Sequence, residues 1–208
     1  MTAFQLHVIL PVTSHFKIML THLIKSINWI DAALLILFIR MIFVGVKNGF
    51  VSEFFKTLGV VAAVFISLHF YSFLAAWAVK KTNYPCVYWD SVVFAGLWLV
   101  VGIFFKYFRD GILYLFKVET NHQGFDKYAA GVVAVGRGIL VCSLTVFLIL
   151  LTFNGPVKRT TFHSFSFKIA GHAAVNTYSY LFKNLVDKLL TGEHYNSAAA
   201  QVLNPVGK

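Results

Sequence analysis

Residues 125–141 read FDKYAAGVVAVGRGILV and combine small, apolar and charged side chains in one segment. Asp126 and Lys127 precede an apolar run that Arg137 interrupts between two glycines, and the apolar residues then resume as far as Phe153. The segment is apolar enough and long enough to enter a membrane. Burying a guanidinium there costs free energy. The first question is therefore whether lipid is the solvent of this chain.

The composition favours a membrane protein. Of the 208 residues, 58% are hydrophobic and 12% are charged, whereas soluble domains have about 25% charged residues. Because so few charged side chains cannot cover a soluble surface, lipid must cover much of it. The net charge of +10 arises mainly from basic residues in short segments between apolar runs. This placement favours membrane orientation and headgroup contact over nucleic-acid binding.

Four apolar segments are predicted to span the membrane as helices, at residues 30–46, 51–79, 91–108 and 129–153. A helix needs about 20 mostly apolar residues to cross a hydrocarbon core of about 30 Å. Only helices and closed barrels span lipid, and the second segment lacks the strand-length alternation of a barrel. We therefore expect an all-α, polytopic membrane helical bundle with four transmembrane helices and an amphipathic C-terminal tail.

Two flanks enclose the predicted membrane domain, which covers residues 29–155. Residues 1–28 form an N-terminal extension that we expect to be partly dispensable, since it contains no span and since Met19 is an alternative start to Met1. Residues 156–208 form the tail, whose polar interruptions are too frequent for a span. We expect one or two amphipathic helices there, lying on the membrane or on the bundle. Their apolar stripe comprises Ala174, Tyr178, Leu181, Leu185 and Leu189.

Polar residues and glycines mark the ends of the first two helices. Asn28 is expected to cap the first helix, with Asp31 near the positive end of its dipole. Trp29 is expected to anchor that end in the membrane interface. Gly49 lies in a tight turn that leads into the second helix.

Small residues in the fourth segment predict a close helix contact. Ala130, Ala134 and Gly138 recur every fourth residue and form a smooth ridge, and Gly131 widens the same face. Small side chains let two helices approach closely in lipid. We expect the ridge to pack within the chain, with packing between two chains as the alternative.

Arg40, Glu53 and Arg137 are candidate intramembrane polar residues. Arg137 lies about 13 Å beyond Tyr128 along a helix, so it needs a polar partner in addition to any snorkelling. Asp126 is about 16 Å away along the axis, which is too far. We therefore expect Glu53 and Arg137 to lie within hydrogen-bonding or water-bridged reach. Structural pairing is favoured, and an ion or solute pathway lined by these groups is the alternative.

The sequence contains no GxSxG, HExxH, CxxC or Walker motif and no cluster of paired carboxylates. These motifs carry the common hydrolytic, metal-dependent and phosphate-binding chemistries. We therefore predict that the protein is not an enzyme and that it has no catalytic residue, cofactor or metal site.

Three segments together have a recognisable pattern: INWIDAALLILF (27–38), KNGFVSEFFKTLG (47–59) and FDKYAAGVVAVGRGILV (125–141). In this pattern the chain resembles the CvpA family, the colicin V production proteins of bacterial inner membranes. Lys127 and Val135 stand where the family often has Arg and Gly. The matching positions include Asn28, Trp29, Asp31, Lys47, Gly49, Phe50, Glu53, Gly59, Asp126, Gly131, Arg137 and Gly138. The resemblance covers residues 27–155, with a weaker one at 166–181.

The resemblance implies a four-helix protein of the bacterial inner membrane that supports toxin production or export and envelope integrity. We predict a non-catalytic accessory or scaffold protein in colicin V-type toxin production and envelope homeostasis. The alternatives are a small channel or transporter, with a polar path near Arg40, Glu53 and Arg137, and a membrane-anchor module. Expected partners are the lipid bilayer and either another membrane protein or a second copy of the chain. Relatives with an extracytoplasmic protease domain favour an outward C-terminus.

Overall fold

The computed structural model describes residues 28–82, 86–115, 124–189 and 194–203. The predictions for the N-terminal extension and Met19 lie outside the described residues. Within the described residues the protein is helical, without strands, as predicted. Its four long helices are each apolar enough to cross a membrane: α2 (Trp29–Asn48), α3 (Phe50–Thr82), α4 (Cys86–Leu115) and α5 (Gly124–Thr152). The protein is thus an all-α, multi-pass membrane bundle.

The four helices coincide with the four predicted spans, and each extends beyond its span at one end or at both. The largest difference is in α4, which begins at Cys86 rather than at residue 91 and ends at Leu115 rather than at residue 108. The apolar run is bounded by Asp90 and by Arg109, whereas the helix continues through both residues. Its 30 residues extend about 45 Å, which exceeds the hydrocarbon thickness of about 30 Å. The ends of α4 therefore reach headgroup depth or the helix is tilted.

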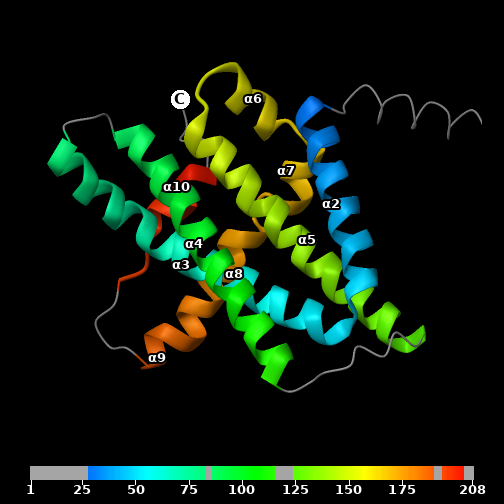
Figure 1. Cartoon of the computed structure of the whole chain (residues 1–208). Coiled ribbons are helices and arrows are strands. Elements are labelled where there is room, and N and C mark those ends of the chain that lie inside the picture. Colours follow the sequence, from blue (N-terminus) through cyan, green and yellow to red (C-terminus); the bar gives the residue numbers. More distant parts are fainter. Residues whose placement is uncertain (1–27, 83–85, 116–123, 190–193, 204–208) are drawn as a thin grey trace, which may run out of the picture.

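Helix α5 runs through the middle of the bundle, with α2 on one side and α4 on the other, while α3 crosses behind it (Figure 1). In the most apolar part of each helix, 50% of α5 is buried inside the protein, against 22% of α2 and 17% of α4. The outer faces of α2 and α4 are therefore the faces that meet lipid.

An aromatic cluster joins three of these helices at the centre of the core. Tyr71 of α3, Phe94 of α4 and Phe147 of α5 have ring centroids 4.9 to 5.9 Å apart. Tyr71 packs edge-on against both phenylalanines, an arrangement that aromatic rings favour. All three side chains are buried, so the cluster fixes how α3, α4 and α5 meet.

The C-terminal segment packs against the bundle, one of the two locations expected for it. Helix α8 contacts α3 and α5, and α7 contacts α2 and α5. Phe167, Ala174 and Tyr178 belong to the same core as the spans, so the core continues beyond residue 155. The elements of this segment are α6 (Pro156–Phe162), α7 (Phe165–Ala170), α8 (Ala173–Leu181), a π-helical turn (Phe182–Val186), α9 (Asp187–Leu189) and α10 (Ser197–Leu203).

The predicted apolar stripe of this segment is correct only in its first part. Ala174 and Tyr178 are fully buried, but Leu185 is 51% exposed. The π-helical turn that begins at Phe182 explains the difference, because a wider turn rotates the residues after it out of the 3.6-residue register. Phe182 itself takes the buried position. The side chain of Leu189 lies outside the described part of the chain.

Small residues bring α2 against α5. A Cβ atom at Gly45 would overlap the Cβ of Ala134, and one at Gly138 would lie 2.8 Å from the Phe38 ring. A Cβ at Gly131 would lie 3.4 Å from Val46. Ala130 and Ala134 are fully buried. The small residues of α5 therefore meet a helix of the same chain.

We predict that stability falls in proportion to side-chain volume at Gly138. Gly138→Ala should lower the thermal unfolding temperature of the detergent-purified protein, and Gly138→Leu should lower it more, because the Phe38 ring must move further. Gly136 is a matched control on the same helix, since a Cβ there meets nothing within 4 Å. Gly136→Leu should be tolerated. Equal tolerance of Leu at positions 136 and 138 would contradict the proposed close contact.

Candidate functional site

A charged junction of Glu53, Lys56 and Arg137 lies where α3 meets α5. Nη2 of Arg137 is 2.7 Å from Oε2 of Glu53, and Nζ of Lys56 is 2.5 Å from Oε1 of the same carboxylate. Glu53 is fully buried and Arg137 is 7% exposed. The structure thus brings together Glu53 and Arg137, which the sequence analysis expected to be close, and adds Lys56.

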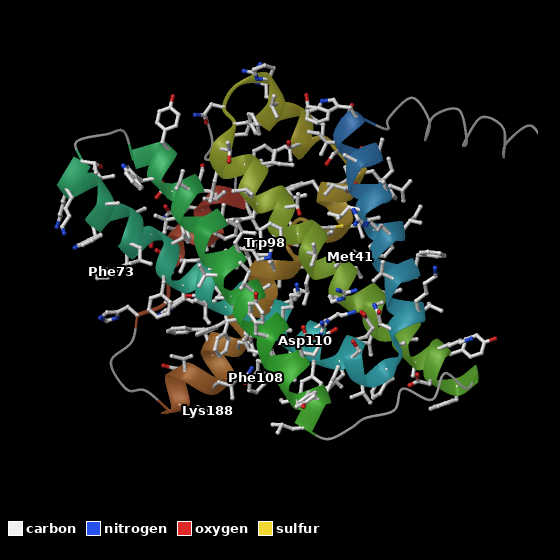
Figure 2. The ribbon with its side chains drawn as sticks, in the orientation of Figure 1. Met41, Phe73, Trp98, Phe108, Asp110 and Lys188 are labelled. Atoms are coloured by element: carbon white, nitrogen blue, oxygen red, sulfur yellow. The ribbon has the colours of Figure 1, made fainter. Side chains whose placement is uncertain are left out.

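Residues of α2 also lie against the carboxylate of Glu53. Asn48, the last residue of α2, donates from Nδ2 to Oε1 of Glu53 at 3.3 Å. Nη2 of Arg137 also donates to the Met41 carbonyl at 3.5 Å, and Met41 lies beside α5 in Figure 2. A Cβ at Gly45 would lie 3.3 Å from Oε2 of Glu53. The absence of a side chain at Gly45 therefore leaves room for the carboxylate.

The ion contact between Glu53 and Arg137 is close but leaves two polar atoms without hydrogen bonds. Neither Oε2 of Glu53 nor Nε of Arg137 has a hydrogen-bond partner among the described residues. The 2.7 Å contact is therefore an ionic contact whose N–H is poorly aligned with the oxygen. Removing an ion from water costs several kcal/mol, and a partner in contact offsets that cost. Each of the two residues therefore needs the other, because either charge alone would be buried without a counter-charge.

Asp126 caps α3 from another helix. Its Oδ1 accepts a hydrogen bond from the backbone N–H of Phe50, the first residue of α3, at 3.0 Å. The first N–H groups of a helix lack partners inside the helix. Gly49, with φ of 77°, makes the turn that presents this end of α3, and such a φ favours glycine. The start of α3 is thereby fixed against the start of α5.

Asp31 joins the ends of two helices. Its carboxylate accepts from the backbone N–H of Asn28 at 3.2 Å, at the start of its own helix. It also accepts from Phe165 at 3.2 Å and from Ser166 at 2.8 Å, at the start of α7. Asn28 donates from its side chain to the Thr160 carbonyl at 3.4 Å. Asp31 therefore connects α2 to the C-terminal segment.

The remaining predicted residues lie away from the charged junction. Arg40 is exposed on α2 and has no ion pair among the described residues. Trp29 is 65% exposed at the start of α2, as an interfacial anchor requires. Gly59 permits close contact of α3 with α4, because a Cβ there would lie 2.8 Å from the Cβ of Phe105.

A cavity of about 180 Å³ adjoins the charged junction between α3, α4 and α5. Trp98 of α4 lies on its wall, about midway along the helix in Figure 2. Neither Glu53 nor Arg40 lines it. Four of its lining side chains are cationic: Lys56, Lys106, Arg109 and Arg137. No group of three or more potential metal ligands occurs in the described ranges.

Ser143 is a connecting residue that the sequence analysis did not identify. It is fully buried, donates to the Gly171 carbonyl at 3.1 Å and accepts from the Ala174 N–H at 2.8 Å. The sequence does contain an indication of this role, because Ser143 is a polar residue within an apolar run. A polar side chain in a membrane helix needs a hydrogen-bond partner. Ser143 attaches the start of α8 to α5.

A second connection ties α10 to α3. Asn196 donates from Nδ2 to the Leu68 carbonyl at 2.7 Å, and its backbone N–H donates to the Tyr178 hydroxyl at 3.0 Å. The same hydroxyl lies 3.1 Å from Nδ1 of His69. No local motif marks these residues, so only the folded arrangement reveals the network.

We predict that Asp31→Ala destabilises the protein more than Asp126→Ala. The first change removes the acceptor of three backbone N–H groups and the second removes the acceptor of one. The expected losses in free energy of unfolding are about 2–4 kcal/mol and about 1–2 kcal/mol, respectively. Unfolding titrations in mixed micelles measure both. Asp187, exposed on α9, is the control, and Asp187→Ala should have little effect. Losses in the reverse order would contradict the assigned roles.

Comparison with known proteins shows that the chain matches one protein family. Residues 30–175 match the family described as colicin V production protein, from α2 into α8. No curated protein and no solved structure matches the chain. The match covers most of the chain and includes Asp31, Glu53, Asp126 and Arg137, around which the bundle is built. The chain therefore belongs to the colicin V production protein family.

Proposed function

We propose that the protein is a non-catalytic accessory or scaffold of the bacterial inner membrane. In this role it supports production or export of a colicin V-type toxin and the integrity of the envelope. The family assignment and the four apolar helices support this role. The proposed partners are another membrane protein of the export process or a second copy of the chain.

The burial of the charged residues is the observation that carries the scaffold proposal. Glu53 and Arg137 contact each other inside the bundle, and Arg40 is exposed on another helix. A conducting path along these three residues requires them to share a wetted surface, and only Arg137 lines the cavity. The separation supports packing as the role of the pair.

We predict that deleting the gene from a toxin-producing bacterium reduces secreted toxin and increases sensitivity to detergents. The wild-type gene should restore both properties. Asp31→Ala should restore them poorly, because it loosens the C-terminal segment, whereas Asp187→Ala should restore them fully. The measurements are growth-inhibition zones and survival in detergent. Unchanged toxin secretion and unchanged detergent survival after deletion would contradict the proposed function.

Cysteine labelling separates the scaffold from a channel. Val141, one helical turn from Arg137, is 8% exposed, so Val141→Cys should not react with a membrane-impermeant maleimide when the native cysteines are replaced. Tyr128→Cys should react, because Tyr128 is 79% exposed near the start of α5. Rapid labelling of position 141 would favour the channel or transporter.

A further inference from the structure

The cavity between α3, α4 and α5 has more positive than negative charge. Its four cationic residues, named above, have two carboxylate neighbours, Glu53 and Asp110. Glu53 serves both Lys56 and Arg137, and Asp110 pairs with Arg109. Lys106 has no carboxylate partner among the described residues. Four cations against two carboxylates leave two positive charges, which an apolar environment disfavours without a counter-ion.

The most buried of these cations also has unused hydrogen-bonding capacity. Arg137 is 7% exposed, and its Nε has no acceptor among the described residues. A guanidinium presents its donors in a planar fork that suits phosphate oxygens. The cavity is also large enough for a tetrahedral oxyanion, since its volume of about 180 Å³ is many times the roughly 10–15 Å³ that a cavity needs to admit one water.

The nearness of three of the cationic residues to helix ends favours a lipid as the source of the anion. Lys106 and Arg109 precede the end of α4 by about 14 Å and about 9 Å, and Lys56 follows the start of α3 by about 9 Å. Because α3 and α4 are longer than the hydrocarbon core, their ends pass its edge, and the long side chains of these residues can extend from there toward the lipid phosphates. Asp110, beyond Trp98 toward the end of α4, marks this end in Figure 2.

Besides its cationic residues, the cavity has apolar lining residues and open space at a glycine. Val60, Ala63, Trp98 and Phe105 contribute its apolar wall. Gly102 also lines it, and a Cβ there would meet nothing within 4 Å. A molecule with an anionic group and an apolar chain matches these two kinds of lining residue.

We propose that this cavity binds a phosphate-bearing anion, with the phosphate of an anionic phospholipid as its source. The phosphate contacts the guanidinium groups of Arg109 and Arg137 and the ammonium groups of Lys56 and Lys106. An acyl chain lies along Trp98 and Phe105. Free inorganic phosphate has the same recognition chemistry without the apolar part. The proposal does not depend on the toxin-related function.

Native mass spectrometry of the full-length protein in detergent tests the proposal by counting bound phosphatidylglycerol directly. Lys106→Gln with Arg109→Gln should weaken its binding about tenfold, because two phosphate-facing charges are lost. The matched control is Arg159→Gln with Lys168→Gln, which removes two exposed charges away from the cavity and should leave binding unchanged.

A second pair of variants blocks the cavity without altering charge. Gly102→Leu should displace the lipid by filling the open space at this glycine. Gly96→Leu on the same helix should not, although a Cβ at Gly96 also meets nothing within 4 Å. Only variants that elute as single, folded species are compared, and Gly102→Ala provides an intermediate volume.

Binding measurements with phosphatidylglycerol, phosphatidylcholine and inorganic phosphate identify the source of the anion. Preference for phosphatidylglycerol over zwitterionic phosphatidylcholine, lost in the cavity variants, supports a lipid site. Binding of inorganic phosphate alone, with the same dependence on Lys106 and Arg109, supports the phosphate site with a free anion as its source. Equal binding of phosphatidylglycerol by wild-type and cavity variants, or equal binding of both lipids, would overturn the proposal.

Discussion

A guanidinium in the middle of a membrane-spanning helix requires a counter-charge, and this requirement organises the bundle. Arg137 of α5 contacts Glu53 in the first turn of α3, so the start of α3 must lie beside the middle of α5. Asp126 fixes the same end of α3 through the Phe50 N–H. Gly45 leaves the space that the carboxylate occupies beside α2. The interaction of two residues thereby places three helices.

The C-terminal segment completes this arrangement through hydrogen bonds to backbone groups. Asp31 accepts from the start of α7, Ser143 connects to the start of α8, and Asn196 reaches a carbonyl of α3. Short helices have many N–H and C=O groups without internal partners, and lipid cannot bond them. Polar side chains from the long helices supply several of these partners. This explains why isolated polar residues occur within otherwise apolar spans.

Much of the fold could be predicted from the sequence, because membrane helices are determined by local hydropathy. The small residues of α5 and the need of Arg137 for a carboxylate also follow from local pattern and electrostatics. The ends of α4 could not be predicted, because the helix continues through charged residues that end the apolar run. The position of Leu185 depends on a π-helical turn that has no sequence signature. The cavity and the second role of Asp31 depend on residues far apart in the chain, which no single segment reveals.

The most direct test of this account is a double-mutant cycle on the buried pair. Glu53→Gln should lower the free energy of unfolding by about 3–5 kcal/mol, since it leaves Arg137 buried without a counter-charge. Lys56→Gln is the control and should cost less, because Lys56 is partly exposed. Combining Glu53→Gln with Arg137→Gln should recover part of the loss, so that the two single effects are not additive. Strictly additive losses, measured by unfolding in mixed micelles, would contradict the claim that this ion pair holds α3 against α5.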